Sequence, residues 1–548
     1  MREKAKKQVF LTGVIILTAA NLLTKVIGLV FKIPLTNMLG NEGMGYFNTA
    51  YQIYTWLYML STAGVPVALS ILVSEFNAKN NRAAAGKLFR LTLVVFSLFG
   101  LAASAAMLLF SRKLAEFIAA DLSFLCIMAI SPALLFVCIS STVRGYFQGQ
   151  RNMLPTAVSE VIEALLKLFV GIALGMYALN KGYPIYKVAA FAIFGVSVGV
   201  IFGAVFLALS ALFSGSLRRE KNLPDAGTEF SSKSLLSSFF RVALPVMLSS
   251  SLLSMSSMID TLIVMRRLQD IGFAKEAAVA VYGNYTAYCV TLFNLPPVLI
   301  YPIVSALIPS LCSAVTCNNS ERVSLLMSKS LKLSAIISLP CTVGLAVMSF
   351  PVLTLIFESR ANAEMAAPLL SVLAPSVFLI GVMAVTNAVL QSFRKQRYSV
   401  YSMIAGAAVK AVSAYLLPAV KIGSGYLGIY ASPVSTFLFY LTITVMNFYF
   451  IARYVNIKLS VFRIFLRPLL AALLCGASAI AVYGIAVKFL GESRIITLSA
   501  ILVAVVVYGL FLLLFGGVNR SDTALIPKVD RLIEKIPLLR FLVSKKDN

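Results

Sequence analysis

Apolar runs of about 20 residues recur along the whole chain and are separated by short polar segments. A run of this length is sufficient for an α-helix to cross the hydrocarbon core of a bilayer. The strict alternation that is typical of a membrane β-barrel strand is not the pattern here. We therefore predict an all-α polytopic membrane protein with 14 transmembrane helices, at residues 9–36, 45–73, 88–110, 122–143, 155–179, 188–213, 238–265, 277–311, 330–357, 366–392, 398–420, 427–452, 464–488 and 496–516.

Composition supports the membrane interpretation. Of the 548 residues, 59% are hydrophobic and 12% are charged, which excludes a soluble globular protein because such proteins carry about 25% charged residues. The formal net charge is +26, but 32 of the 47 Lys and Arg residues fall in alternate connections that include both ends of the chain. By the positive-inside rule, both termini are predicted to be cytoplasmic. The charge thus needs no nucleic-acid partner.

Histidine is absent, and the seven cysteines form no CxxC pair. We therefore expect no metal or other cofactor and no disulfide framework.

The halves of the chain repeat each other weakly in the same direction, which predicts two pseudo-symmetric six-helix lobes plus a C-terminal helix pair. The expected parts are an N-lobe at 1–217, a cytoplasmic linker at 218–237, a C-lobe at 238–455, the helix pair at 456–518 and an amphipathic cytoplasmic tail at 519–548. The matching positions are Asn48 with Asn284, Pro66 with Pro302, Ser74 with Ser310, Phe147 with Phe393, Gln150 with Gln396 and Arg151 with Arg397.

Ionisable residues deep in a membrane span usually face a partner or a polar cavity. Lys25 and Lys32 are two helical turns apart in the first span and share one face, which suits an anion such as a phosphate or diphosphate. For Lys32, reaching out to the interface is the alternative.

Further spans contain other ionisable residues. Glu163 and Lys167 are spaced to form a neutralising pair four residues apart. Asp260 and Lys410 each lack an oppositely charged neighbour on their own helix, and we hypothesise that they pair with each other.

Two segments resemble a known family. Val143–Pro155, VRGYFQGQRNMLP, resembles the stage V sporulation protein B group, and residues 24–36, TKVIGLVFKIPLT, are similar to the first helix of that group and of the MurJ lipid II flippases. Both groups belong to the multidrug/oligosaccharidyl-lipid/polysaccharide exporter (MOP) superfamily. The resemblance extends along essentially the whole chain.

This resemblance implies two lobes around a central cationic cavity, alternating access, and a lipid-tail groove on the last two helices. Lys25 and Gly28 match the basic and glycine positions of the MurJ first helix, but Phe31 replaces the next basic residue and Lys32 follows it. The arginines of MurJ helices two and eight have no counterpart, because residues 46–73 and 277–311 contain no Lys or Arg. Where sodium-coupled members carry an acid on helix eleven, this chain has Lys410, which leaves sodium dependence open.

The combined prediction is a flippase, not an enzyme, in the bacterial cell membrane. It would move an undecaprenyl-diphosphate-linked peptidoglycan precursor (lipid II) outward, in growth or sporulation, driven by membrane potential or an ion and working beside cell-wall synthesis machinery. The substrate-binding candidates are Lys25, Lys32, Arg144, Arg151 and Arg241, and the cavity or coupling candidates are Glu163, Lys167, Asp260, Asn284 and Lys410.

Two alternatives remain at this point. A cation-coupled multidrug antiporter of the same superfamily would use carboxylates such as Glu163 and Asp260. A membrane glycosyltransferase would need paired catalytic carboxylates near an outer loop, and the predicted outer loops are short and carry only scattered acids.

Overall fold

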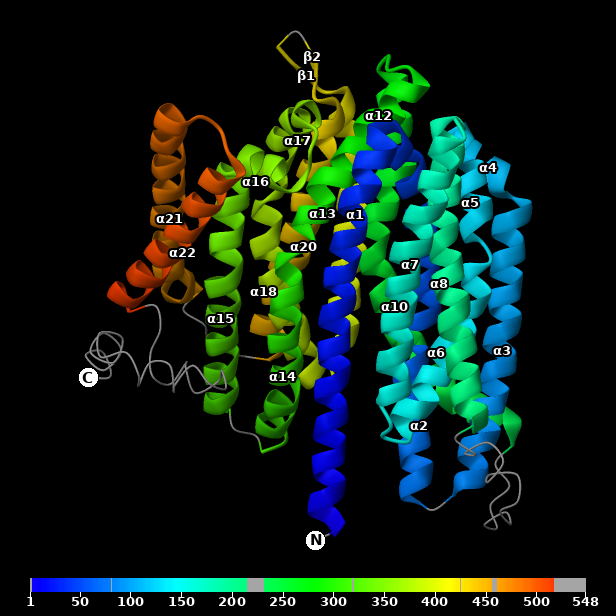
Figure 1. Ribbon diagram of the computed structural model, residues 1–548. Coiled ribbons are helices and arrows are strands. Elements are labelled where there is room, and N and C mark those ends of the chain that lie inside the picture. Colours follow the sequence, from blue (N-terminus) through cyan, green and yellow to red (C-terminus); the bar gives the residue numbers. More distant parts are fainter. Residues whose placement is uncertain are drawn as a thin grey trace. The chain divides into compact units, whose positions relative to one another are not determined.

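The computed structural model describes residues 2–79, 81–213, 231–317, 320–423, 425–455 and 461–516. These residues are nearly all helical (Figure 1), and the strands among them are one antiparallel pair of two residues each, β1 and β2. The elements are α1(Arg2–Thr62), α2(Val65–Ala78), α3(Arg82–Leu109), α4(Ser111–Phe117), η1(Asp121–Ser123), α5(Phe124–Ile130), α6(Ala133–Gly149), α7(Leu154–Asn180), α8(Ile185–Phe213), α10(Ser232–Ile259), η2(Asp260–Val264), α11(Met265–Asp270), α12(Lys275–Asn284), η3(Tyr285–Cys289), α13(Val290–Phe293), α14(Pro296–Thr316), α15(Ser320–Val347), α16(Ser349–Ile356), α17(Arg360–Leu373), α18(Pro375–Ser392), α19(Gln396–Leu416), η4(Leu417–Ala419), β1(Lys421–Ile422), β2(Gly425–Tyr426), η5(Gly428–Tyr430), α20(Ala431–Tyr454), α21(Val461–Leu490) and α22(Arg494–Leu514).

The helices form two compact units. Unit 1 comprises Met1–Ala287 and Ala414–Ile429, and unit 2 comprises Tyr288–Ser413 and Tyr430–Asn548. The predicted lobe boundary lies elsewhere, at the 218–237 linker, of which residues 218–230 lie outside the described part; the predicted tail at 519–548 also lies outside it.

In unit 1, α7 and α8 run side by side and α1 packs against α7, α10 and α12. Although α1 is continuous by hydrogen bonding, Gly40 has φ 61° and ψ −169°, a conformation essentially restricted to glycine. The chain therefore turns back at Gly40, and the two predicted spans on either side of it become neighbours. Elsewhere in unit 1, buried apolar side chains from α2, α3, α6, α8 and α10 pack into one core.

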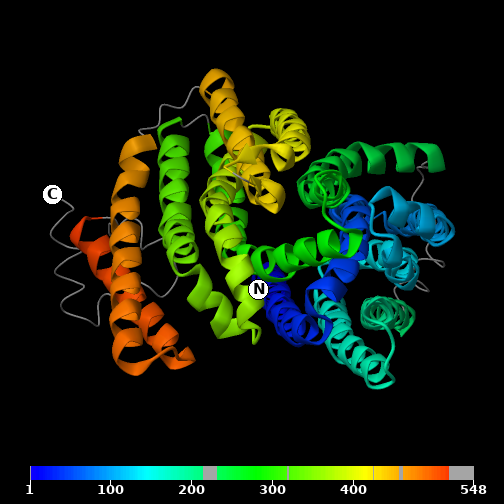
Figure 2. The same ribbon diagram turned by 90° about the horizontal axis from the view of Figure 1, so that it is seen from above.

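In unit 2, α15 packs against α14, α18 and α21, and the view from above shows α21 alongside α15 (Figure 2). The last two helices, α21 and α22, pack on each other, and the Tyr508 hydroxyl of α22 donates a 2.7 Å hydrogen bond to the Ile336 carbonyl of α15. The C-terminal pair is thus part of the packed unit.

Twelve helical segments among the described residues are long and apolar enough to cross a membrane. One of them, Ile16–Ala78, contains two predicted spans joined at Gly40. The predicted span 277–311 is divided between α12, η3, α13 and α14, and it is not among the twelve. The membrane-spanning helical architecture is confirmed, whereas the count of fourteen is not.

The turns that end α6 and α18 are alike, and they correct the predicted repeat register. Arg151 and Arg394 both adopt left-handed backbone conformations, with φ 62° and 57°. The residue after each donates its N–H to a carbonyl five residues back, at 2.9 Å in the first turn and 2.8 Å in the second, which is the Schellman pattern of a helix C-terminus. The structural counterpart of Arg151 is therefore Arg394, not Arg397.

Candidate functional site

Lys32 is half-buried in unit 1. Its ammonium donates a 2.7 Å hydrogen bond to the Asn48 side-chain oxygen and lies 5.7 Å from the centre of the Phe47 ring. Asn48 is 2% exposed, and its amide donates in turn to the Thr286 hydroxyl at 2.9 Å. Because Asn48 is neutral, this chain of bonds positions the lysine charge without cancelling it.

Lys167 of α7 is a second cation in the same region. Its ammonium donates a 3.3 Å hydrogen bond to the Tyr51 hydroxyl and lies 5.2 Å from the ring centre of Phe31 and 5.0 Å from that of Tyr51. The charge of Lys167 also acts on Lys32. Among the described residues, neither ammonium forms an ion pair with a carboxylate. Two like charges are therefore held near each other by neutral groups and aromatic faces.

A row of aromatic rings continues along α1 from Phe47 through Tyr51 and Tyr54 to Tyr58, with successive ring centres 5.8–6.0 Å apart. The spacing of three or four residues places these rings on one helical face. The row extends from the Lys32 region toward the charges of Glu163, Glu160 and Arg144, which act on Tyr58.

Arg144 of α6 is 8% exposed and binds two side chains of α7. It donates to the Ser159 hydroxyl at 3.2 Å and to a Glu163 carboxylate oxygen at 3.0 Å. Glu160 lies one turn from Glu163, and its charge interacts with Arg144 and with Lys25 of α1. One buried oxygen of Glu160 has no hydrogen-bond partner among the described residues.

These contacts contradict the predicted pairing of Glu163 with Lys167. Glu163 bonds Arg144 across two helices, and Lys167 turns to Tyr51 instead. Helical spacing made the pair feasible, but a guanidinium offers a carboxylate a stronger, directional hydrogen bond. Lys25 is exposed, so the two lysines of the first span occupy different environments.

Two further substrate-binding candidates, Arg151 and Arg241, are exposed at the end of α6 and in α10. Among the contacts of the described residues, none joins them to the half-buried Lys32 and Lys167 or to the buried Arg144.

Asp260 and Asn284 are buried in unit 1, with 5% and 0% exposure. Asp260 begins the π-helical segment η2, and the next residue, Thr261, shares a 2.7 Å hydrogen bond with Tyr282 of α12. The Asn284 amide donates to the Asn41 side-chain oxygen at 3.3 Å.

Lys410 lies in unit 2 on α19, where it is 1% exposed and donates a 2.8 Å hydrogen bond to the Thr436 hydroxyl of α20. Its hypothesised pairing with Asp260 joins residues of different units and stays a prediction.

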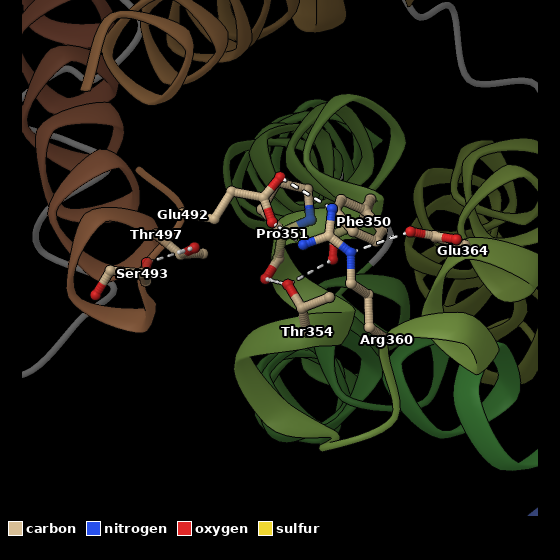
Figure 3. A network of polar contacts seen from close by, with 8 residues as sticks. All are labelled: Phe350, Pro351, Thr354, Arg360, Glu364, Glu492, Ser493 and Thr497. Atoms are coloured by element: carbon tan, nitrogen blue, oxygen red, sulfur yellow. Dashed lines mark hydrogen bonds and ion pairs between the residues drawn. The ribbon is translucent and has the colours of Figure 1, made fainter. Parts of the chain in front are cut away.

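A separate polar network in unit 2 holds the loop between α21 and α22 (Figure 3). Both guanidinium NH2 groups of Arg360 bond the Glu492 carboxylate, and its Nε donates to Glu364 at 3.1 Å. The guanidinium also lies over the Phe350 ring. Because Arg360 begins α17 and Glu492 precedes α22, this network ties the C-terminal helix pair to the rest of its unit.

Sequence reasoning missed the tyrosine row and the contact of Arg144 with Ser159. The spacing of Tyr51, Tyr54 and Tyr58 on one face was a usable signal. Among the described residues, no group of three or more His, Cys, Asp or Glu side chains is placed to hold a metal ion.

Comparison with known proteins gives two family matches. Residues 10–315 match the model described as polysaccharide biosynthesis protein, and residues 245–416 match the MatE model. Among curated relatives, stage V sporulation protein B of Bacillus subtilis is 25% identical over 531 residues, covering 96% of this chain and 99% of that protein. Lipid II flippase MurJ of the same organism is 26% identical over 426 residues, covering 73% and 76%.

Solved structures show the same fold. The inward closed conformation of lipid II flippase MurJ aligns with a TM-score of 0.69 at 14% identity, over 91% of this chain and 98% of that one. An inward-facing MATE multidrug resistance transporter of the MOP superfamily aligns with a TM-score of 0.64 at 16% identity, over 79% and 94%. Together with a family match over more than half of the sequence, these findings show that the chain is a multi-pass membrane protein of the polysaccharide biosynthesis protein family.

Proposed function

We propose that this protein is a flippase that moves a lipid-linked saccharide carrying a diphosphate from the inner to the outer leaflet. The observation that carries the proposal is the pair of ammonium groups of Lys32 and Lys167, half-buried in unit 1 and bonded to neutral partners. Burying unneutralised charge is unfavourable, so an anionic ligand that completes the site gains free energy. Cationic drugs would be repelled by the same two groups.

The finer substrate within this proposal is lipid II. The MurJ and stage V sporulation protein B relatives support it, as does the aromatic row of Tyr51, Tyr54 and Tyr58 beside the two lysines. Aromatic faces stack on the apolar faces of sugar rings, while the ammonium groups bind phosphate oxygens. Outward movement of an anion also gains about 2.3 kcal/mol per charge for each 100 mV of inside-negative potential.

The test is exposure of lipid II at the outer surface of cells that have been depleted of their own flippase. This chain is expressed, a lipid II-degrading toxin is added outside, and the cleaved precursor is counted. We expect wild type to restore cleavage, and Lys32→Ala and Lys167→Ala each to reduce it at least about tenfold through loss of one charge-assisted phosphate contact.

Lys113→Ala is the matched control, because Lys113 is an exposed cation beside one ring, that of Phe110. It should leave cleavage unchanged at equal membrane expression. No cleavage with well-inserted wild type would remove lipid II as the substrate, and cleavage that survives both lysine variants would remove the assigned site.

A cation-coupled multidrug antiporter is the second candidate, supported by the MATE structural likeness, by the half-buried carboxylate of Glu160 and by the buried carboxylate of Asp260. It predicts raised resistance to cationic drugs on expression, which is lost on Asp260→Asn. Unchanged drug susceptibility alongside restored lipid II cleavage would eliminate it.

We also propose that the protein resides in the bacterial cell membrane with both termini cytoplasmic, in growth or in sporulation, and that α21 and α22 accommodate the lipid tail. The charge distribution of the sequence supports the orientation. Reporter fusions at each terminus that show an outer location would refute it.

A further inference from the structure

The second half of the chain contains a long stretch with no acidic residue. Between Met365 and Gly491 there is no Asp or Glu, yet the same stretch has ten basic residues. Three of these, Lys395, Arg397 and Arg453, come together at the ends of α19 and α20. The chain thus supplies positive charge here without nearby sequence to neutralise it.

Aromatic rings organise these cations into one patch. Tyr398 and Tyr454 stack with ring centres 4.5 Å apart and planes 18° from parallel. Lys395 lies over both rings, at 5.9 and 5.7 Å from their centres. Arg397 lies 5.2 Å from the centre of Tyr398, and Arg453 lies 5.8 Å from that of Tyr454.

Other neighbours fix the patch further. Arg453 donates a 2.7 Å hydrogen bond to the Tyr449 hydroxyl, and the ring centres of Phe450 and Tyr398 are 4.9 Å apart. The N-terminus of α19 begins at Gln396, between Lys395 and Arg397, and adds the positive end of a 21-residue helix dipole. Among the described residues, no ion pair forms with any of the three cations.

The corresponding turn in unit 1, at Arg151, carries fewer basic residues than the turn at Arg394. Arg151 has the backbone conformation of Arg394, but Asn152 stands where Lys395 follows Arg394. The charge cluster is therefore not a requirement of the turn, which forms equally well with one cation.

We propose that the patch formed by Lys395, Arg397, Arg453, Tyr398 and Tyr454 binds the phosphate of an anionic phospholipid headgroup. The patch lies at the ends of two membrane-spanning helices, where headgroups are found and where tyrosine is favoured. Three like charges gathered on two rings repel each other, and one phosphate brought between them removes that repulsion. The inference does not depend on the transported substrate.

The test uses purified full-length protein titrated with short-chain phosphatidylglycerol or phosphatidylcholine, with binding read by native mass spectrometry. The variant is K395Q/R397Q/R453Q. The control is R112Q/K113Q/K181Q, which removes the same charge from cations that each lie over a single, separate ring. At about fivefold per cation, we expect roughly 100-fold weaker phosphatidylglycerol binding for the patch variant and little change for the control.

Equal weakening by both triple variants, or by neither, would overturn the proposal. So would a patch that binds a short prenyl diphosphate in preference to phosphatidylglycerol, since that would assign it to the isoprenoid carrier. If the patch variant fails to fold, wild type carries the test. A photoactivatable phosphatidylglycerol should label peptides 394–401 and 449–454, and labelling confined to other peptides would refute the site.

Discussion

Removing Arg144 should destabilise unit 1 more than removing its partner Glu163. Arg144 is 8% exposed and joins two carboxylates of α7, one by a 3.0 Å bond and one, Glu160, through its charge. Arg144→Gln leaves both carboxylates one turn apart without their shared cation. Glu163→Gln leaves Arg144 with Glu160 as a remaining partner.

The magnitude follows from burial. Breaking a fully buried pair costs about 3–5 kcal/mol of unfolding free energy. Because the Glu163 side chain is 24% exposed, we discount this to about 2–3 kcal/mol for Arg144→Gln and about 1 kcal/mol for Glu163→Gln. The double variant should cost less than the sum of the two, with a coupling energy of about 1 kcal/mol.

The assay is SDS-induced unfolding in mixed micelles for wild type, both single variants and the double variant. Glu160→Gln added to Arg144→Gln should recover stability, because it removes the repulsion between the two carboxylates. Additive single effects, or a larger loss for Glu163→Gln than for Arg144→Gln, would refute this account of the charge cluster.

Three further predictions concern other contacts. Where α1 and α12 cross, a Cβ on Gly283 would collide with the Asn41 carbonyl, so Gly283→Ala should lower the unfolding free energy by about 1–3 kcal/mol. Gly344→Ala, where a Cβ would meet open space, should leave the unfolding free energy unchanged. An equal loss of stability in both variants would show that the close helix crossing is not the cause. Glu492→Gln should raise the rate of amide hydrogen exchange in the α21–α22 loop several-fold, whereas Glu358→Gln at an exposed position should leave that rate unchanged. Equal exchange rates in the two variants would show that the Arg360–Glu492 network does not stabilise the loop. The hydrogen bond to Asp121 raises the pKa of Lys275, so the stabilising contribution of this pair is present below the ordinary lysine pKa and is lost as pH rises through the raised value. The difference in melting temperature between wild type and Lys275→Gln should therefore shrink at alkaline pH. A difference that grows at alkaline pH would be inconsistent with a stabilising Lys275–Asp121 pair.

Hydrophobic run length predicted the helical membrane architecture, because a bilayer imposes one minimum length on every crossing helix. It could not predict that 277–311 would be divided among several elements, since an apolar run looks the same whether its backbone is continuous or broken. Similarly, counting along the sequence misassigned the repeat at Arg397. The backbone turn at Arg394, which identifies the register, depends on φ and ψ and not on side-chain identity.

For the site, sequence reasoning found most of the charged residues but not their partners. Lys32 and Lys167 were evident because charge in a span is rare, whereas Arg144 directly follows the predicted span 122–143. The bonds from Lys32 to Asn48 and from Arg144 to Glu163 join separate helices, and helical spacing carries no information about such contacts.

The non-helical backbone of Gly40 makes it a hinge between the two arms of α1, Arg2–Leu39 and Asn41–Thr62. Gly40 has a backbone conformation that is essentially restricted to glycine. The hydrogen bond between Lys32 and Asn48, which are 16 residues apart, joins the two arms close to this hinge. A small change in the angle between the two arms at Gly40 would therefore stretch the hydrogen bond between Lys32 and Asn48. A single methyl group at position 40 would disfavour the hinge conformation itself and alter the opening of the arms while leaving every polar group in place.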